Sequence, residues 1–140
     1  DLSLQHVSRP LLRRMRRWGD DERFRATIEA IREREPAATF RSNFIVGYPG
    51  ETEEDHDRLL AFVEEVRLDW CGFFAYSRED GTYAADLDGV VPRELMDERL
   101  SEHRLRLPRE RWRRELNELS FLRDDGGRAE VDRVVFTRPR

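Results

Sequence analysis

The stretch "SNFIVGYPGETEED", residues 42–55, predicts a strand that passes through a tight turn into a helix. Residues 44–46 form a short apolar run with two β-branched side chains, as expected for a strand covered on both faces. Two glycines and a proline in residues 47–51 favour a turn. Thr52 is a good helix N-cap, Asp55 completes a box-like pattern, and the glutamates between them suit the positive end of the helix dipole.

This strand–turn–helix has two interpretations. In α/β folds the loops that follow the carboxyl ends of strands bind ligands, so residues 47–51 are a candidate binding loop. The alternative is that they are only a well-formed connection. They are not a phosphate loop, because "GYPG" lacks the glycine-rich run that ends in Lys-Ser/Thr.

Composition sets limits on the class of protein. The 140 residues are enough for one domain. The 26 basic and 30 acidic residues give a net charge of −4, which is not a nucleic-acid-binding balance. No apolar run is long enough to span a membrane and no signal-peptide pattern opens the chain, so we expect a soluble, cytoplasmic protein. The chain begins without Met, in an apparent strand, which suggests a piece of a longer protein.

Strand-like and helix-like segments alternate along the chain in the order β-α-α-β-α-β-α. The expected elements are a strand over 1–6, a short helix after Ser8, a helix from Asp20 to about 35, a strand over 39–46, a helix over 52–66, a strand over 69–77 and a helix over roughly 92–107. This alternation predicts an α/β fold with a parallel sheet and right-handed crossovers. Three strands are too few for a closed barrel, so we expect part of a (β/α) barrel over 1–107. Residues 108–140, with a possible helix over 109–121 and a "VVF" strand fragment, are expected to form a weakly packed tail.

Few residues in the chain have obvious chemistry. The three histidines, His6, His56 and His103, have no ligand-like spacing, and we expect His56 and His103 on helix surfaces. The single cysteine, Cys71, excludes a disulfide, a Cys-based zinc site and an iron–sulfur cluster held by this chain alone. We interpret Cys71 as a small core residue rather than a nucleophile. Accordingly, no metal ligand and no catalytic residue is predicted here.

A basic cluster stands at the end of the first helix, in the four arginines 13, 14, 16 and 17. Two explanations remain open. The cluster complements the negative end of the helix dipole, or it binds an anion.

Three motifs carry a resemblance to a known family. "LQHVSRPLLRRMRR", "RSNFIVGYPGETEED" and "DWCGFFAYSREDGTYAADL" occur in this order, and "VP" opens the next helix. Together they resemble the radical SAM methylthiotransferases, and the ribosomal-protein branch more than the tRNA branch, over residues 1 to about 102. The resemblance implies the later strands of a radical SAM (β/α) barrel. It also implies S-adenosyl-L-methionine and a [4Fe–4S] cluster as cofactors in the full-length family, with a second cluster that supplies sulfur. The substrate of that branch is an aspartate of a small-subunit ribosomal protein.

The resemblance also assigns cofactor-binding roles. Ile45 would pack on the adenine of S-adenosylmethionine, and Gly47 would let the backbone turn close to it. Asn43, on the same strand face as Ile45 by period-two alternation, would reach the ribose hydroxyls. Gln5, at the end of the first strand, would be a second polar contact.

An arginine is expected to bind the methionine carboxylate. By the same resemblance, Arg17 fits the place of the arginine that pairs with this carboxylate, an anion that a bidentate guanidinium pair suits. Arg16 could substitute for it.

The chain also departs from the family pattern. The family's CxxxCxxC loop, its N-terminal cluster domain and its C-terminal TRAM domain are absent from these residues, and Ser3 stands where the family usually has Pro. The tail after about residue 103 does not match the family's next segment. We therefore expect a fragment from the S-adenosylmethionine-binding half that does no radical chemistry unaided. Its expected partners are a ribosomal protein or the ribosome, or the missing N-terminal part of the barrel.

Three alternatives stay open. The chain could be a fragment of a tRNA methylthiotransferase, a non-catalytic α/β interaction module, or an unrelated nucleotide-binding α/β enzyme.

Overall fold

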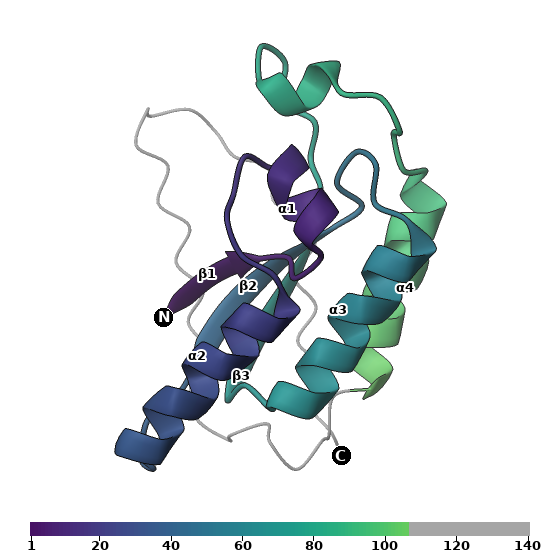
Figure 1. The fold of residues 1–140 in the computed structure, drawn as a ribbon. Coiled ribbons are helices and arrows are strands. Elements are labelled where there is room, and N and C mark those ends of the chain that lie inside the picture. The colour runs from purple at the N-terminus through teal and green to yellow at the C-terminus, as the bar shows by residue number, and fades with distance from the viewer. Residues whose placement is uncertain (107–140) are drawn as a thin grey trace, which may run out of the picture.

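A parallel three-stranded sheet organises residues 1–106, the part of the chain that this computed structural model describes (Figure 1). The elements are β1 (Leu2–Gln5), α1 (Arg9–Arg14), α2 (Asp21–Arg34), β2 (Arg41–Val46), α3 (Glu53–Val66), β3 (Trp70–Ala75), the 3-10 helix η1 (Tyr83–Asp86) and α4 (Arg93–Arg106). The strand order is β1-β2-β3, and both pairs are parallel. The predicted α/β class with a parallel sheet is confirmed, whereas η1 was not expected. The expected tail over 108–140 lies outside the described residues.

The core lies on one face of the sheet. In β2 the alternate residues Ser42, Phe44 and Val46 have no exposed surface, because their side chains face the helices. The chain segments that pack around them contribute the remaining core residues, which are Leu4, Val7, Ile28, Phe40, Leu59, Phe62, Val63, Val66 and Leu68. This burial of apolar side chains from β1, β2, α2 and α3 holds the helices on the sheet.

The opposite face of β2 corrects one expectation. We expected a strand covered on both faces, but the strand alternates between buried and partly exposed residues. Arg41 is exposed, and Asn43 and Ile45 are half-buried. We call this less buried face, which carries Asn43 and Ile45, the open face.

Local capping signals explain where the helices begin. Asp20 caps α2, and its carboxylate accepts a hydrogen bond from the backbone N–H of Arg23 at 2.9 Å. Thr52 and Asp55 form the reciprocal capping box of α3 that the sequence predicted. Ser8 holds the N-cap position of α1, but its side chain makes no capping bond there.

The prediction that His56 and His103 lie on helix surfaces is wrong. Both are buried, because α4 packs against α3 and β3 at this position. The two rings meet edge to face with centroids 5.1 Å apart, and His103 stacks on Phe73 at 4.0 Å. Nε2 of His56 lies 2.9 Å from Oε2 of Glu102.

Cys71 is half-buried and packs against the core, as expected. Burial, with a smaller contribution from the charge of Asp69, raises the pKa of the thiol to about 12. The thiolate is therefore scarce at neutral pH, which agrees with a packing role.

None of the helices in residues 1–106 combines the length and the apolar character that crossing a bilayer requires.

Candidate functional site

The candidate site lies at the carboxyl ends of the strands, where the chain leaves β1 at Gln5, β2 at Val46 and β3 at Ala75 (Figure 1). Because the strands are parallel, these ends meet at one edge of the sheet. The segments that lead into α1, α3 and α4 therefore surround the same edge. Open α/β sheets bind their ligands at this edge.

The turn after β2 requires glycine at its first position. Gly47 has φ of 81°, which side chains rarely adopt. A Cβ atom at this position would lie 2.3 Å from Cγ of Met96, so a side chain there would force Met96 of α4 to shift. Further along the turn, the N–H of Gly50 donates to the carbonyl of Gly89 at 2.7 Å. The turn is thus fixed against the segment that precedes α4 and against α4 itself.

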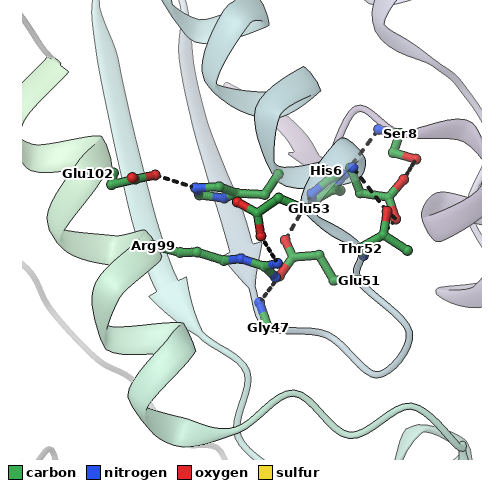
Figure 2. A network of polar contacts seen from close by, with 10 residues as sticks. His6, Ser8, Gly47, Glu51, Thr52, Glu53, Arg99 and Glu102 are labelled. Atoms are coloured by element: carbon green, nitrogen blue, oxygen red, sulfur yellow. Dashed lines mark hydrogen bonds and ion pairs between the residues drawn. The ribbon is translucent and has the colours of Figure 1, made fainter.

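A buried carboxylate holds this turn in place. Figure 2 shows Glu51 between residues from three parts of the chain. One oxygen, Oε2, accepts the N–H of Gly47 at 2.5 Å and Nη1 of Arg99 at 2.8 Å, and the other, Oε1, lies 3.3 Å from Nε2 of His6. The Nδ1 atom of His6 accepts the N–H of Ser8 at 3.0 Å, so Nε2 carries the proton that it donates to Glu51.

Arg99 connects α4 to the network. Its side chain is 4% exposed, and its second terminal nitrogen donates to Glu53 at 2.9 Å (Figure 2). Burial alone lowers the pKa of Arg99, but the bonds and charges of Glu53 and Glu51 outweigh burial and raise it. The hydrogen bond from Arg99 in turn lowers the pKa of Glu53. Arg99 is therefore a permanent cation that joins the first turn of α3 to α4.

A second polar group lies beside the first. The hydroxyl of Ser8 donates to Oδ1 of Asp55, and the backbone N–H and hydroxyl of Thr52 donate to Oδ2 at 2.9 and 2.8 Å. Burial raises the pKa of Asp55, but these hydrogen bonds outweigh it, and the pKa lies below its ordinary value. The start of α1 and the start of α3 are joined through this carboxylate.

The two clusters of polar side chains, one around Glu51 and one around Asp55, have a structural role in the observed geometry. Both oxygens of Glu51 and both nitrogens of His6 are engaged by groups of this chain, so neither side chain is available to a ligand. Neither Glu51 nor Arg99 was predicted from the sequence. A glutamate directly before an N-cap threonine was the available signal, but it resembled the other acidic residues of the helix start.

The open face carries two of the predicted cofactor residues. Asn43 and Ile45 lie on it together, as period-two alternation predicted, and Gly47 follows at the strand end. Oδ1 of Asn43 is buried and has no hydrogen-bond partner among the described residues. The neighbours on β3 are Gly72 opposite Asn43 and Phe74 opposite Ile45.

The other predicted residues occupy different positions around β1. Gln5 ends β1 with φ of 66° and is half-buried. Nη2 of Arg17 donates to the carbonyl of Ser3 at 2.5 Å, so its guanidinium lies against β1 rather than beside Asn43. The guanidinium of Arg16 lies 3.7 Å above the ring of Tyr83. No contact in the structure tests the carboxylate-binding role of either arginine.

The basic cluster has contacts inside the chain as well. Nε of Arg14 donates to the carbonyl of Pro49 at 3.1 Å, and its Nη2 donates to the side chain of Asp88 at 2.6 Å. The hydrogen bond raises the pKa of Arg14 and lowers that of Asp88. Arg14 thus joins the three segments that follow β1, β2 and β3.

Within residues 1–106, no group of three or more His, Cys, Asp or Glu side chains is arranged to hold a metal ion.

Comparison with known proteins agrees with the resemblance of the three sequence motifs. No protein-family model matches the chain. The ribosomal protein uS12 methylthiotransferase RimO of Kineococcus radiotolerans is 56% identical over 100 residues, which cover 71% of this chain and 21% of that protein. RimO of Moorella thermoacetica is 48% identical over 151 residues, which cover 99% of this chain and 34% of that protein. The chain is a homologue of these methylthiotransferases, and it spans between a fifth and about a third of their length.

The Moorella relative also bears on the tail. We expected no family resemblance beyond about residue 103, and the Kineococcus relative covers 71% of the chain. The alignment with the Moorella relative covers 99%, so it continues past the point at which we expected the resemblance to end.

A solved structure supports the fold. Coproporphyrinogen III oxidase (HemN) from Escherichia coli, described as a radical SAM enzyme, matches with a TM-score of 0.59 over 71% of this chain and 24% of that one. The sequence identity is 23%, so the match concerns the fold alone.

Proposed function

We propose that residues 1–107 are the later part of the (β/α) barrel of a radical SAM methylthiotransferase of the ribosomal-protein type. In this proposal the open face of the sheet is one wall of the S-adenosylmethionine site. The observation that carries the proposal is that Asn43 and Ile45 share the open face and lead directly into the glycine turn. The homology to uS12 methylthiotransferases supports the assignment of the family.

The residues of the open face fit the nucleoside part of the cofactor. Asn43 keeps a buried carboxamide oxygen without a partner among residues 1–106, which suits a group that binds a polar ligand. Ile45 lies two residues after Asn43, closer to the turn. Its half-buried apolar side chain would pack on the adenine ring. Gly47 would let the backbone turn close to the adenine, and Gln5 would supply a second polar contact from β1. S-adenosylmethionine, when bound, supplies the methyl group and the radical chemistry of the family.

An arginine that binds the methionine carboxylate would have to move from its observed position. Arg17 would have to leave the carbonyl of Ser3 to pair with that carboxylate, and Arg16 would have to leave the ring of Tyr83. Both movements are within the reach of an exposed arginine side chain.

The iron–sulfur cluster does not fit the residues of this chain. A [4Fe–4S] cluster is held by three or four thiolates, and the sequence contains one cysteine. The cluster ligands therefore have to come from elsewhere in a longer protein, and the role proposed for this chain is limited to one wall of the nucleoside site.

The proposed substrate is an aspartate of a small-subunit ribosomal protein, because the relatives are ribosomal protein uS12 methylthiotransferases. A ribosomal protein or the ribosome is then the partner, and the cytoplasm is the location. Residues 108–140 are proposed as a separate segment that follows the barrel part.

A chimera tests the proposal. Residues 1–102 replace the matching segment of the Kineococcus methylthiotransferase, and mass spectrometry of its ribosomal protein substrate measures the added methylthio group. We expect modification by the chimera, and loss of most of it when the chimera also carries Asn43→Ala. A chimera that folds and binds its full complement of iron but leaves the substrate unmodified would contradict the proposal.

A matched control uses Glu54→Ala in the same chimera. Glu54 is exposed in the first turn of α3 and pairs only with Arg58 among the described residues, so this change should leave activity intact. If both alanine variants remained active, Asn43 would have no role in the site, although the segment itself would still support catalysis.

A further inference from the structure

Gly72 lies directly opposite Asn43 in the sheet and has no side chain with which to contact a ligand. β2 and β3 pair in parallel with Asn43 next to Gly72, and both residues belong to the open face. The backbone of Gly72 is buried. The surrounding atoms lie so close that no other residue type would fit without movement.

The distances around Gly72 are specific. A Cβ atom there would lie 2.6 Å from Oδ1 of Asn43, 2.9 Å from Cη2 of Trp70 and 3.1 Å from Cε2 of Phe74. The carboxamide of Asn43 thus occupies the space that a side chain on β3 would take. Trp70 and Phe74, the neighbours of Gly72 along the open face of β3, line this space on both sides.

The backbone does not require glycine at this position. The φ of Gly72 lies outside the left-handed region, in contrast to Gly47 and Gly81. Strain of the main chain therefore does not explain the glycine. Crowding by the three side chains explains it, and the nearest of them is the proposed ribose ligand.

We propose that Gly72 is a positioning residue of the nucleoside site. It leaves open the space in which the Asn43 carboxamide lies between Trp70 and Phe74, and it thereby sets the direction in which Asn43 meets a ribose hydroxyl. This inference rests on the proposed function, because it takes the ligand of Asn43 to be a nucleoside. It adds a residue on β3 that does not touch the ligand and acts through Asn43.

The first experiment measures the crowding itself in the full 140-residue chain. Gly72→Ala should lower the unfolding temperature, and the same change in an Asn43→Ala background should lower it by clearly less, because the nearest clash is gone. Asn43→Ala alone is the reference for the double variant, so the comparison isolates the effect of Gly72→Ala in each background. Equal losses for Gly72→Ala in both backgrounds would overturn the proposal. If Gly72→Ala alone fails to fold, restoration of folding by Asn43→Ala supports it, and failure to restore folding overturns it.

The second experiment asks what Asn43 binds. The side-chain amide signal of Asn43 is followed by NMR while adenosine is added up to its solubility limit, because binding in the millimolar range or weaker is expected, and methionine serves as a ligand that lacks the nucleoside. In the unaltered chain and in Gly81→Ala the signal should shift with adenosine but not with methionine. In Gly72→Ala the signal should start at a different position and respond several-fold less.

The outcomes separate the role of Gly72 from the nucleoside site itself. If the Asn43 signal of the unaltered chain does not shift with adenosine, the result contradicts the nucleoside site. The proposed function and this inference are then both wrong. A signal that responds equally in Gly72→Ala and in the unaltered chain contradicts the role of Gly72 alone and leaves the nucleoside site in place.

Discussion

Arg99 of α4 and Glu51 of the β2–α3 turn form an ion pair, with Nη1 and Oε2 2.8 Å apart and neither side chain more than 4% exposed. The two residues are 48 positions apart in the chain. Glu51 also accepts the N–H of Gly47, so this carboxylate connects the Arg99 cation of α4 to the turn that would lie beside the adenine. The last described helix therefore stabilises the geometry of the proposed cofactor wall.

Removal of the buried cation should destabilise the fold strongly. Arg99→Met keeps much of the side-chain volume but leaves Glu51 buried without its charged partner, which costs about 3–5 kcal/mol. Urea unfolding at neutral pH, followed by circular dichroism, measures the loss. Arg93→Met is the control, because Arg93 makes an exposed pair with Asp97 on the same helix and should change stability by no more than about 0.5 kcal/mol. A loss for Arg99→Met as small as that of the control would refute the structural role of the pair.

Acid should selectively weaken the contact between the starts of α1 and α3. The folded-state pKa of Asp55 is lowered, so its ionised form contributes stability that is present above its unfolded pKa, near 4, and is lost as the pH falls through the folded pKa. Asp55→Asn should cost about 1–2 kcal/mol at pH 7, because hydrogen bonds to a charged group are stronger than those to a neutral one. The difference from the unaltered chain should shrink below about pH 4.

Urea titrations at several pH values between 7 and 3 provide this comparison. Asp57→Asn, on the exposed side of the same helix turn, is the reference for a general effect of charge removal. A difference between Asp55→Asn and the unaltered chain that stays constant down to pH 3 would speak against the assigned contribution.

Local signals in the sequence predicted the strand–turn–helix of residues 42–55 well. Period-two alternation placed Asn43 and Ile45 on one face, and the capping pattern of Thr52 and Asp55 predicted where α3 begins. These features depend on neighbours within a few residues, so sequence spacing carries them. The roles assigned to them in cofactor binding remain predictions.

The long-range packing could not be predicted in the same way. His56 was expected on a helix surface because periodicity within one helix does not identify which second helix covers it, and α4 buries it. The Glu51–Arg99 pair depends on the same placement of α4. Gly72 was not recognised because its importance comes from a side chain on the neighbouring strand.

The two glycines with nearly the same backbone conformation should tolerate alanine differently. Gly47 and Gly81 have φ of 81° and 80°, so alanine adds similar backbone strain of about 1–2 kcal/mol at both. Only at Gly47 does the new Cβ meet another residue, Met96. Gly47→Ala should therefore cost about 1–3 kcal/mol more than Gly81→Ala in thermal unfolding. Equal losses would show that α4 does not press on the turn.

The isolated chain should hold no stable [4Fe–4S] cluster. It contains one cysteine, and burial of Cys71 raises the pKa of its thiol to about 12, which further disfavours the thiolate that iron requires. Anaerobic reconstitution with iron and sulfide, followed by measurement of bound iron and acid-labile sulfide, tests this. About four irons per chain would contradict both the ligand count and the inert state of Cys71.

Binding of S-adenosylmethionine by this chain alone should be weak. The site would offer few contacts to the ligand. Arg17 would form one charge-assisted pair, Asn43 and Gln5 would form one or two neutral hydrogen bonds, and Ile45 would be part of an adenine wall. Each neutral bond adds about 0.5–1.5 kcal/mol, whereas immobilising the ligand costs several kcal/mol. We therefore expect a dissociation constant on the order of millimolar or weaker, measured by calorimetry or ligand-observed NMR. Micromolar binding that persists in Asn43→Ala and Arg17→Ala would refute the proposed site. Micromolar binding that these changes abolish would keep the site and show that one wall of it suffices.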